Sequence, residues 1–311
     1  MQLVMLSGGV GGARMARGLA ATPEVTLTVV VNVADDDLIH GLHVSADVDT
    51  VVYTLAGIEG PDGWGRSEET WTAMHELALL PEADTSFRLG DRDLALNLYR
   101  TGRLLRGDPL SDITRDVCDG LGVRSSVLPA TDDPVRTMVA TTAGEFDFQT
   151  YFVRRRHADA VTGISFRGLD EAEPAPGVLE AIEGADAVVI APSNPILSIW
   201  PILGVRGLRE SVRSAPAVVA VSPLIGGKAV KGPAAEVMPA LGFEPSISGV
   251  AAAYGGLVTH LVIDASETDQ PPSGVEVLRT ETMMPSKPES IRLAQEVVSG
   301  FADRPADPRR A

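Results

Sequence analysis

Residues 2–14 read QLVMLSGGVGGAR, and this stretch decides the fold. The apolar run Gln2–Leu6 predicts a short buried β-strand, and the glycines that follow it mark the start of a helix. A helix start presents unpaired backbone N–H groups and the positive end of the helix dipole, and glycine lets an anion approach the backbone closely. The stretch therefore predicts a strand–loop–helix unit that binds a phosphate group.

A second predicted strand, Thr26–Val33, leads into a segment rich in carboxylates. These are Asp35, Asp36, Asp37, Asp47 and Asp49. Carboxylates grouped in this way repel one another unless a cation or hydrogen-bond donors hold them, and hard divalent ions prefer oxygen ligands. Beside a phosphate site, the segment predicts a nucleotide and a magnesium ion. The alternative is a solvated loop in which Asp49 caps a helix over Thr50–Ala56.

The glycine loop matches neither of the common nucleotide-binding patterns. The dinucleotide fingerprint G-x-G-x-x-G would need a glycine where Arg14 stands, and the Gly-Lys-Ser/Thr sequence of a Walker loop is absent. Acidic residues some twenty positions after the glycines keep a nicotinamide dehydrogenase open as an alternative. A tight turn whose glycines serve only close packing is another. The cationic side chain of Arg14 favours anion binding.

Composition excludes several classes of protein. The chain has 311 residues with 44% hydrophobic side chains, enough for a large core, and its formal net charge of −16 disfavours a nucleic-acid partner. Its one cysteine, Cys118, excludes an intramolecular disulfide and is typical of a reducing compartment. The sequence shows neither a signal peptide nor an apolar run of membrane-spanning length. We therefore expect a cytoplasmic protein without a membrane partner.

Strand-like and helix-like stretches alternate along the chain, which predicts an α/β fold. We expect a Rossmann-like, doubly wound, mostly parallel sheet with helices on both faces. The roughly 150 residues between the second strand and Ala187 are too many for one crossover. We therefore expect a single domain over 1–311 that carries an insert over about 50–170, helical at first and then antiparallel. The further strands expected are Ala187–Ala191, Ala217–Val221 and Leu261–Asp264 in the main sheet, and Val135–Thr142, Phe148–Arg154 and Val161–Arg167 in the insert.

Two polar loops follow predicted strands of the main sheet. Ser193 and Asn194 come after Ala187–Ala191, and Gly226 comes after Ala217–Val221. Ligands of open α/β sheets bind beyond the carboxyl ends of the strands, so these loops are expected to face the glycine loop across one cleft. The alternative is that their prolines only mark the ends of loops.

Taken in order, a set of short motifs resembles the CofD/FbiA family of 2-phospho-L-lactate transferases, or phosphoenolpyruvate transferases, of coenzyme F420 biosynthesis. The motifs are SGGVGGAR at 7–14, VNVADD at 31–36, DVDT at 47–50, LGDRD at 89–93, LPATDDP at 128–134, PSNP at 192–195 and SPLIG at 222–226. The stretch 60–71, with GWG at 63–65 and ETW at 69–71, is similar to the actinobacterial branch. That likeness implies a phosphoenolpyruvyl rather than a phospholactyl donor.

The resemblance implies a reaction and a set of residues. The ribityl hydroxyl of the deazaflavin Fo attacks a guanosine diphosphate-linked donor, GMP leaves, and the product is dehydro-F420-0 or F420-0. Asp49 and Arg88 are implied to contact Fo on the side of the insert, and Asp36 and Asp49 to hold Mg²⁺, with Asp49 either a metal ligand or the catalytic base. The implied donor contacts are Gly8, Gly9, Gly11, Gly12, Asn32, Ser193, Asn194 and Gly226. A homodimer is implied as well.

The same superfamily offers an alternative from another functional class. The glycine loop and the loop after the second strand are also similar to gluconeogenesis-factor proteins, which bind nucleotide sugars and regulate rather than catalyse. The segments that favour the transferase are Trp64–Trp71 and the motif at 89–93.

Overall fold

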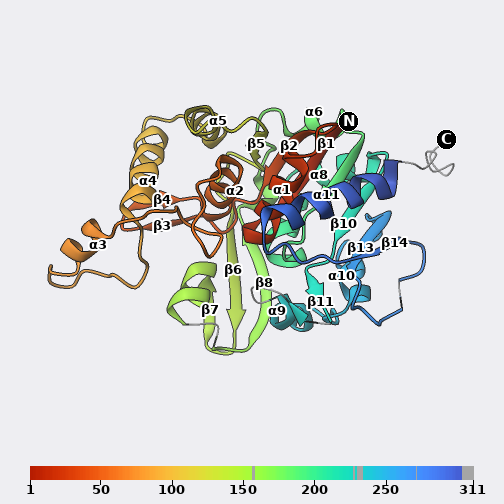
Figure 1. Cartoon of the computed structure of the whole chain (residues 1–311). Helices are drawn as coiled ribbons and strands as arrows, with labels where there is room; N and C mark the ends of the chain where they lie inside the picture. Colours follow the sequence, from red (N-terminus) through yellow and green to blue (C-terminus); the bar gives the residue numbers. More distant parts are fainter. Residues whose placement is uncertain (156–157, 227, 230–233, 271, 303–311) are drawn as a thin grey trace.

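A sheet of seven parallel strands forms the centre of the molecule (Figure 1). The computed structural model describes residues 1–302 except 156–157, 227, 230–233 and 271. In spatial order the strands are β14 (Glu276–Thr280), β13 (His260–Asp264), β10 (Val218–Val221), β9 (Ala187–Ile190), β1 (Gln2–Ser7), β2 (Thr26–Val31) and β5 (Ser126–Pro129). The predicted α/β fold with a doubly wound, mostly parallel sheet is confirmed.

The central strands are apolar throughout because both faces of the sheet are covered. In β1, Val4 and Leu6 belong to one hydrophobic core, while Leu3 and Met5 belong to the core on the opposite face. The first core is covered by α6 (Val178–Glu183), η3 (Pro195–Ile199), α7 (Trp200–Gly204), α8 (Leu208–Ser214), α9 (Ala234–Ala240) and α10 (Ile247–Ala253). The second is covered by α1 (Gly9–Ala20), α2 (Ala46–Ala56), α5 (Leu110–Gly120) and α11 (Lys287–Ala302).

The order of the strands reverses between β1 and β9. From β1 the chain proceeds to β2 and β5 on one side, and then returns to β9 on the other side of β1. Ligands of open α/β sheets usually bind beyond the carboxyl ends of two such strands. The glycine loop follows β1 and the Ser193–Asn194 loop follows β9, so both lie at this position of the sheet.

Between β2 and β9 the chain also forms two outlying parts, in addition to β5, α2, α5 and α6 of the central fold. The arm consists of the hairpin β3 (Asp37–Ile39)–β4 (Leu42–Val44) with α3 (Thr72–Leu77) and α4 (Asp91–Leu104), and it projects sideways from the sheet (Figure 1). It has its own small apolar cluster around Ile39, Val44 and Leu89. The lobe is the antiparallel sheet of β6 (Arg136–Thr141), β7 (Gly144–Asp147) and β8 (Val161–Arg167), with the π-helical turn η1 (Thr150–Arg154). The remaining elements are η2 (Leu169–Glu171), β11 (Leu224–Ile225) and β12 (Lys228–Ala229).

One expected strand is absent, and the alternative interpretation of Asp49 as a helix cap was wrong. The segment Phe148–Arg154 is not a strand, because the Asp147 carboxylate accepts hydrogen bonds from the backbone N–H (2.7 Å) and hydroxyl (2.8 Å) of Thr150 and turns the chain into η1. The strand that pairs with β6 is Gly144–Asp147 instead. The helix that contains Asp49 begins at Ala46 rather than Thr50, so Asp49 lies in its first turn and not at its cap.

Replacing Gly11 by alanine is expected to destabilise the fold. A Cβ at Gly11 would lie 2.5 Å from the carbonyl oxygen of Pro192, so the loops after β1 and β9 would be forced apart. We expect a loss of about 1–3 kcal/mol in the free energy of unfolding, measured by urea denaturation. Gly102→Ala is the matched control: a Cβ there meets nothing within 4 Å, and alanine in a helix should add about 0.5–1 kcal/mol. A Gly11→Ala variant as stable as Gly102→Ala would contradict this account.

Candidate functional site

The side chain of Ser193 joins the loop after β9 to the glycine loop after β1. Its Oγ accepts a hydrogen bond from the Gly8 N–H (3.1 Å) and donates one to the Gly8 carbonyl oxygen (2.6 Å). Ser193 is buried, so this hydroxyl binds both backbone groups of Gly8 away from water. The glycine loop and the Ser193–Asn194 loop, two of the loops that the sequence predicts to face one another, are therefore in direct contact.

The glycines of the first loop are required by close packing as well as by backbone conformation. A Cβ at Gly12 would lie 2.1 Å from the Ser7 Oγ, and one at Gly8 would lie 2.6 Å from the Ser198 Cβ. Gly9 has a φ of +62°, which side chains other than glycine rarely adopt. Neighbouring parts of the chain thus occupy much of the space that these glycines leave.

A carboxylate of the chain itself lies at the N-terminus of α1. Asp47 accepts a hydrogen bond from the Gly9 N–H (2.8 Å) at Oδ1 and another from the Asn32 side chain (3.0 Å) at Oδ2. Burial raises the pKa of Asp47 to about 6, against the hydrogen bond from Asn32. Any phosphate that binds at this helix terminus has to share the position with Asp47 or displace it.

Asp49 is a buried carboxylate with only one oxygen engaged. Its Oδ1 forms an ion pair with the guanidinium of Arg100, while its buried Oδ2 has no hydrogen-bond partner in the described part of the chain. Burial raises the pKa of Asp49 to about 6, and Asp93 and Asp36 add to this rise, while Arg100 opposes it. The arrangement leaves one carboxylate oxygen available to a ligand.

The acidic group consists of four aspartates: Asp35, Asp36, Asp47 and Asp49. Asp36 accepts hydrogen bonds at Oδ2 from His43 Nε2 (3.0 Å) and from the Ser45 hydroxyl (2.5 Å). Asp35 receives a hydrogen bond from the Asn32 side chain (3.2 Å), and burial together with the charge of Asp47 raises its pKa well above the usual range. Its buried Oδ1 has no hydrogen-bond partner among the described residues.

The unengaged oxygens of these carboxylates are of the chemical kind that a magnesium ion binds together with substrate atoms. The described residues contain no group of three or more His, Cys, Asp or Glu side chains arranged to hold a metal by themselves. Mg²⁺ commonly takes one or two protein carboxylates, several waters and the phosphates of a substrate. The free oxygens of Asp35 and Asp49 have the chemistry that such an ion needs.

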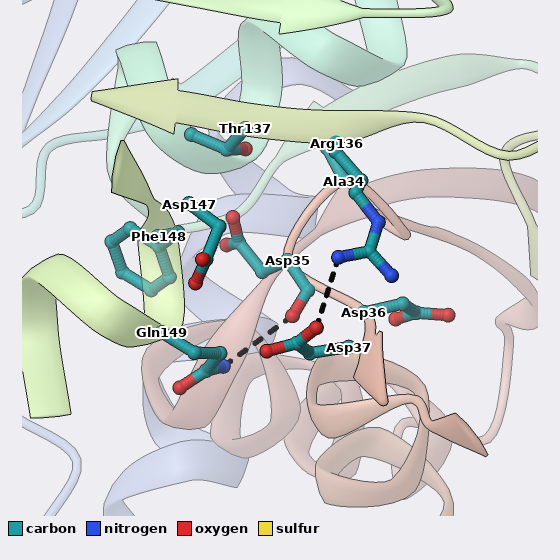
Figure 2. A pocket seen from close by; sticks show the side chains of 9 residues that line it. All are labelled: Ala34, Asp35, Asp36, Asp37, Arg136, Thr137, Asp147, Phe148 and Gln149. Carbon is teal, nitrogen blue, oxygen red and sulfur yellow. Dashed lines mark hydrogen bonds and ion pairs between the residues drawn. The ribbon is translucent and has the colours of Figure 1, made fainter. Parts of the chain in front are cut away.

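The lobe and the acidic segment enclose a narrow pocket between them (Figure 2). Arg136 pairs with the Asp37 carboxylate at 3.0 Å, and the Gln149 side chain donates to the Asp35 carbonyl oxygen at 3.3 Å. The remaining lining residues are Ala34, Asp36, Thr137, Asp147 and Phe148. The volume open to water is only about 10 Å³, close to the space of one water molecule. The lobe therefore packs against the loop of Asp35 and supports it.

The other predicted contact residues lie at separate points of the molecule. Arg88 is exposed, and its guanidinium stacks over the ring of Trp71 at 4.5 Å. Asn194 caps η3 with its Oδ1, while its buried Nδ2 donor has no partner in the described residues. Gly226 is the exposed turn of the β11–β12 hairpin. The structure gives no contact between Arg88 or Gly226 and the acidic group.

Sequence reasoning missed the roles of Asp47 and Arg100. Asp47 lies in the quoted motif, but nothing in the sequence indicates that it reaches the first loop. Arg100 belongs to a polar stripe on α4, together with Asp93 and Asn97, at spacings of four and three residues. The spacing is helical, so the stripe could have been found, but a polar stripe usually indicates a solvent-exposed face.

Together, the strand-order reversal, the glycine loop and the buried carboxylates define an α/β protein with an acidic ligand site at the carboxyl edge of its sheet. The family described as 2-phospho-L-lactate transferase CofD matches residues 3–299. The chain belongs to this family, and it is an enzyme of the transferase class.

Curated relatives cover almost the whole chain. A protein of Methanopyrus kandleri named 2-phospho-L-lactate transferase is 41% identical over 302 residues, which cover 96% of this chain and 97% of the relative. A protein of Nocardia farcinica named phosphoenolpyruvate transferase is 40% identical over 312 residues, which cover 96% and 94%. The two names differ in the group that is transferred, so they do not decide which donor this chain uses.

Among solved structures, a Bacillus halodurans protein of the UPF0052 family has a TM-score of 0.63 at 18% identity, with 95% of this chain and 98% of that chain covered. This likeness supports the fold.

None of the helices in the described ranges is long and apolar enough to cross a membrane.

Removing the Ser193 hydroxyl is expected to destabilise the fold, because it breaks the link between the two loops. In Ser193→Ala, the buried N–H of Gly8 loses its partner and the Gly8 carbonyl oxygen loses one hydrogen bond, which should lower the free energy of unfolding by about 1–3 kcal/mol. Ser211→Ala is the control, because the buried Ser211 Oγ has no partner to lose within the described chain. Thermal and urea unfolding of both variants test this, and equal stabilities of the two would contradict the bridging role.

Proposed function

We propose that this enzyme transfers a phosphoenolpyruvyl or 2-phospho-L-lactyl group from a guanosine diphosphate-linked donor to the ribityl hydroxyl of the deazaflavin Fo. The products are dehydro-F420-0 or F420-0 and GMP, and the reaction belongs to coenzyme F420 biosynthesis. The match of the CofD family over residues 3–299 carries the proposal. The geometry of the acidic group supports it.

The proposed chemistry needs no covalent enzyme intermediate. The acceptor oxygen forms a bond to the phosphorus that bears the three-carbon group, the bond from this phosphorus to the oxygen of GMP breaks, and the acceptor hydroxyl loses its proton. Such transfers depend on alignment and on neutralised charge rather than on a protein nucleophile. Asp49 is well suited to the acceptor side, because its Oδ2 is unengaged and its pKa is raised to about 6. It acts there as the base or as a ligand of the metal.

Magnesium is the cofactor that we propose, held by Asp36 and Asp49. When bound, it supplies positive charge against the phosphates of the donor. Asp36 keeps its His43 and Ser45 contacts on Oδ2, which leaves Oδ1 for this role. Asp49 contributes Oδ2, since Arg100 engages Oδ1. Asp35, whose Oδ1 is also unengaged, lies in the same acidic group.

We propose that the donor phosphates bind between the glycine loop and Asn194. The buried Nδ2 of Asn194 is a donor without a partner in the described chain, as a group reserved for an anionic ligand would be. The N–H groups of Gly8 and Gly9 already have partners in Ser193 and Asp47. Gly11, Gly12, Asn32 and Gly226 remain proposed contacts of the donor.

Arg88 is the proposed partner of the flat acceptor ring, on the side of the insert. Its guanidinium already stacks on one aromatic ring, that of Trp71, at 4.5 Å, and a planar cation of this kind stacks well on aromatic faces. The homodimer and the cytoplasmic location expected from the sequence stay predictions. Light scattering after size-exclusion chromatography tests the dimer.

A turnover assay tests the transferase. Purified protein is mixed with Fo, Mg²⁺ and either donor, and mass spectrometry follows the deazaflavin. We expect a mass gain on Fo together with GMP release, and a loss of about 10²–10⁴ in kcat for Asp49→Asn. Asp112→Asn is the control, since Asp112 lies on α5 in an exposed pair with Arg115. No product despite tight binding of a guanine or uridine diphosphate would favour the nucleotide-binding regulator instead.

Removal of the metal gives a second test. Activity should disappear after EDTA treatment and return with added Mg²⁺. Mg²⁺ should also raise the melting temperature at pH 8 and have little effect at pH 5, because protons occupy the carboxyl of Asp49, with its pKa of about 6, at the lower pH. Differential scanning fluorimetry with and without MgCl₂ measures this shift. Full turnover in the presence of excess EDTA would remove magnesium from the mechanism.

A further inference from the structure

We infer that Arg100 is the positioning residue that fixes the orientation of Asp49 and reserves its Oδ2 for the reacting groups. This inference rests on the proposed function for the role of Asp49, and on the buried ion pair between Arg100 and Asp49 for the contact. Arg100 lies on α4 of the arm, whereas Asp49 lies on α2 beside the sheet. A residue of the insert thus fixes the orientation of a side chain in the central fold.

The guanidinium of Arg100 is itself held firmly. Its Nη2 binds Asp49 Oδ1, while its Nη1 donates to Asn97 Oδ1 (2.7 Å) and to the His43 carbonyl oxygen (3.2 Å). The side chain is only 3% exposed, and that of Asp49 is 7% exposed. A planar guanidinium anchored at both terminal nitrogens has little freedom to rotate, so it fixes the direction in which the carboxylate points.

The pairing leaves the two oxygens of Asp49 unequal. Oδ1 is occupied by Arg100, and Oδ2 is buried without a partner in the described residues. An unsatisfied buried carboxylate oxygen is costly in a folded protein, and such atoms are kept where a ligand satisfies them. The geometry therefore presents one defined oxygen, rather than a freely rotating carboxylate, to an acceptor hydroxyl or a cation.

The two helices are joined at a second point, which provides a control. The Tyr53 hydroxyl, one turn after Asp49 on α2, donates to Asp93 Oδ1 (2.7 Å), two turns before Arg100 on α4. Tyr53→Phe removes this attachment while the Arg100–Asp49 pair stays in place. A role in holding α4 against α2 is common to both pairs, but of the two pairs it is Arg100–Asp49 that engages the Asp49 carboxylate.

The test compares Arg100→Met, Arg100→Lys and Tyr53→Phe. We expect Arg100→Met to lower kcat and kcat/KM about equally, by roughly 10²-fold, because a displaced catalytic group loses alignment while substrates still bind. Arg100→Lys should recover part of kcat, since an ammonium can pair with Asp49 but cannot keep both other contacts. Tyr53→Phe should keep kcat within a few-fold of the wild type. Circular dichroism confirms that each variant is folded at the assay temperature.

A crystal structure of Arg100→Met gives a readout that is independent of turnover. We expect the Asp49 side chain to adopt a different rotamer, with Oδ2 no longer in its present position. An unchanged Asp49 orientation would overturn the inference, as would a kcat loss in Tyr53→Phe as large as that in Arg100→Met. Absence of transfer by the wild-type protein would refute the proposed function instead, and the rotamer of Asp49 would still decide the role of Arg100.

Discussion

Repulsion among buried carboxylates is the constraint on which the rest of this site depends. Parallel strands end at one edge of the sheet, and the chain brings four aspartates together there in a protein that already carries a net charge of −16. Each of them accepts hydrogen bonds from the chain itself, and Asn32 serves two of them. The pairs are Asp35 with Asn32, Asp36 with His43 and Ser45, Asp47 with Gly9 and Asn32, and Asp49 with Arg100. The arm is needed because it supplies the only arginine among these donors.

This arrangement explains how a fold used for many purposes carries this chemistry. The parallel sheet places the loops after β1 and β9 side by side, and Ser193 holds them together. In the proposed function the added parts complete the site: the arm carries Arg88 and Arg100, and the lobe supports the loop of Asp35. Groups that move a phosphoryl unit need placement more than reactivity, and buried, hydrogen-bonded carboxylates provide placement.

Much of the fold could be predicted from the sequence, because buried parallel strands are short apolar runs that alternate with helices. β5 was missed because Ser126–Pro129 is short and ends in proline, and Phe148–Arg154 was taken for a strand because its Asp147–Thr150 turn has no apolar signature. Motifs located the acidic group. The partner of Asp49 could not be found in this way, because Arg100 is 51 residues away in sequence and only packing of α4 against α2 brings it there.

The carboxylate of Asp47 at the start of α1 also has a consequence for selectivity. A helix terminus already neutralised by an internal anion discriminates against small anions, since inorganic phosphate must compete with a group that is present at very high effective concentration. A larger ligand can offset that competition through contacts with other parts of the site. If a donor phosphate displaces Asp47 in the proposed reaction, the same carboxylate returns to the Gly9 N–H when the leaving group departs, and the empty enzyme is not left with an uncompensated helix dipole.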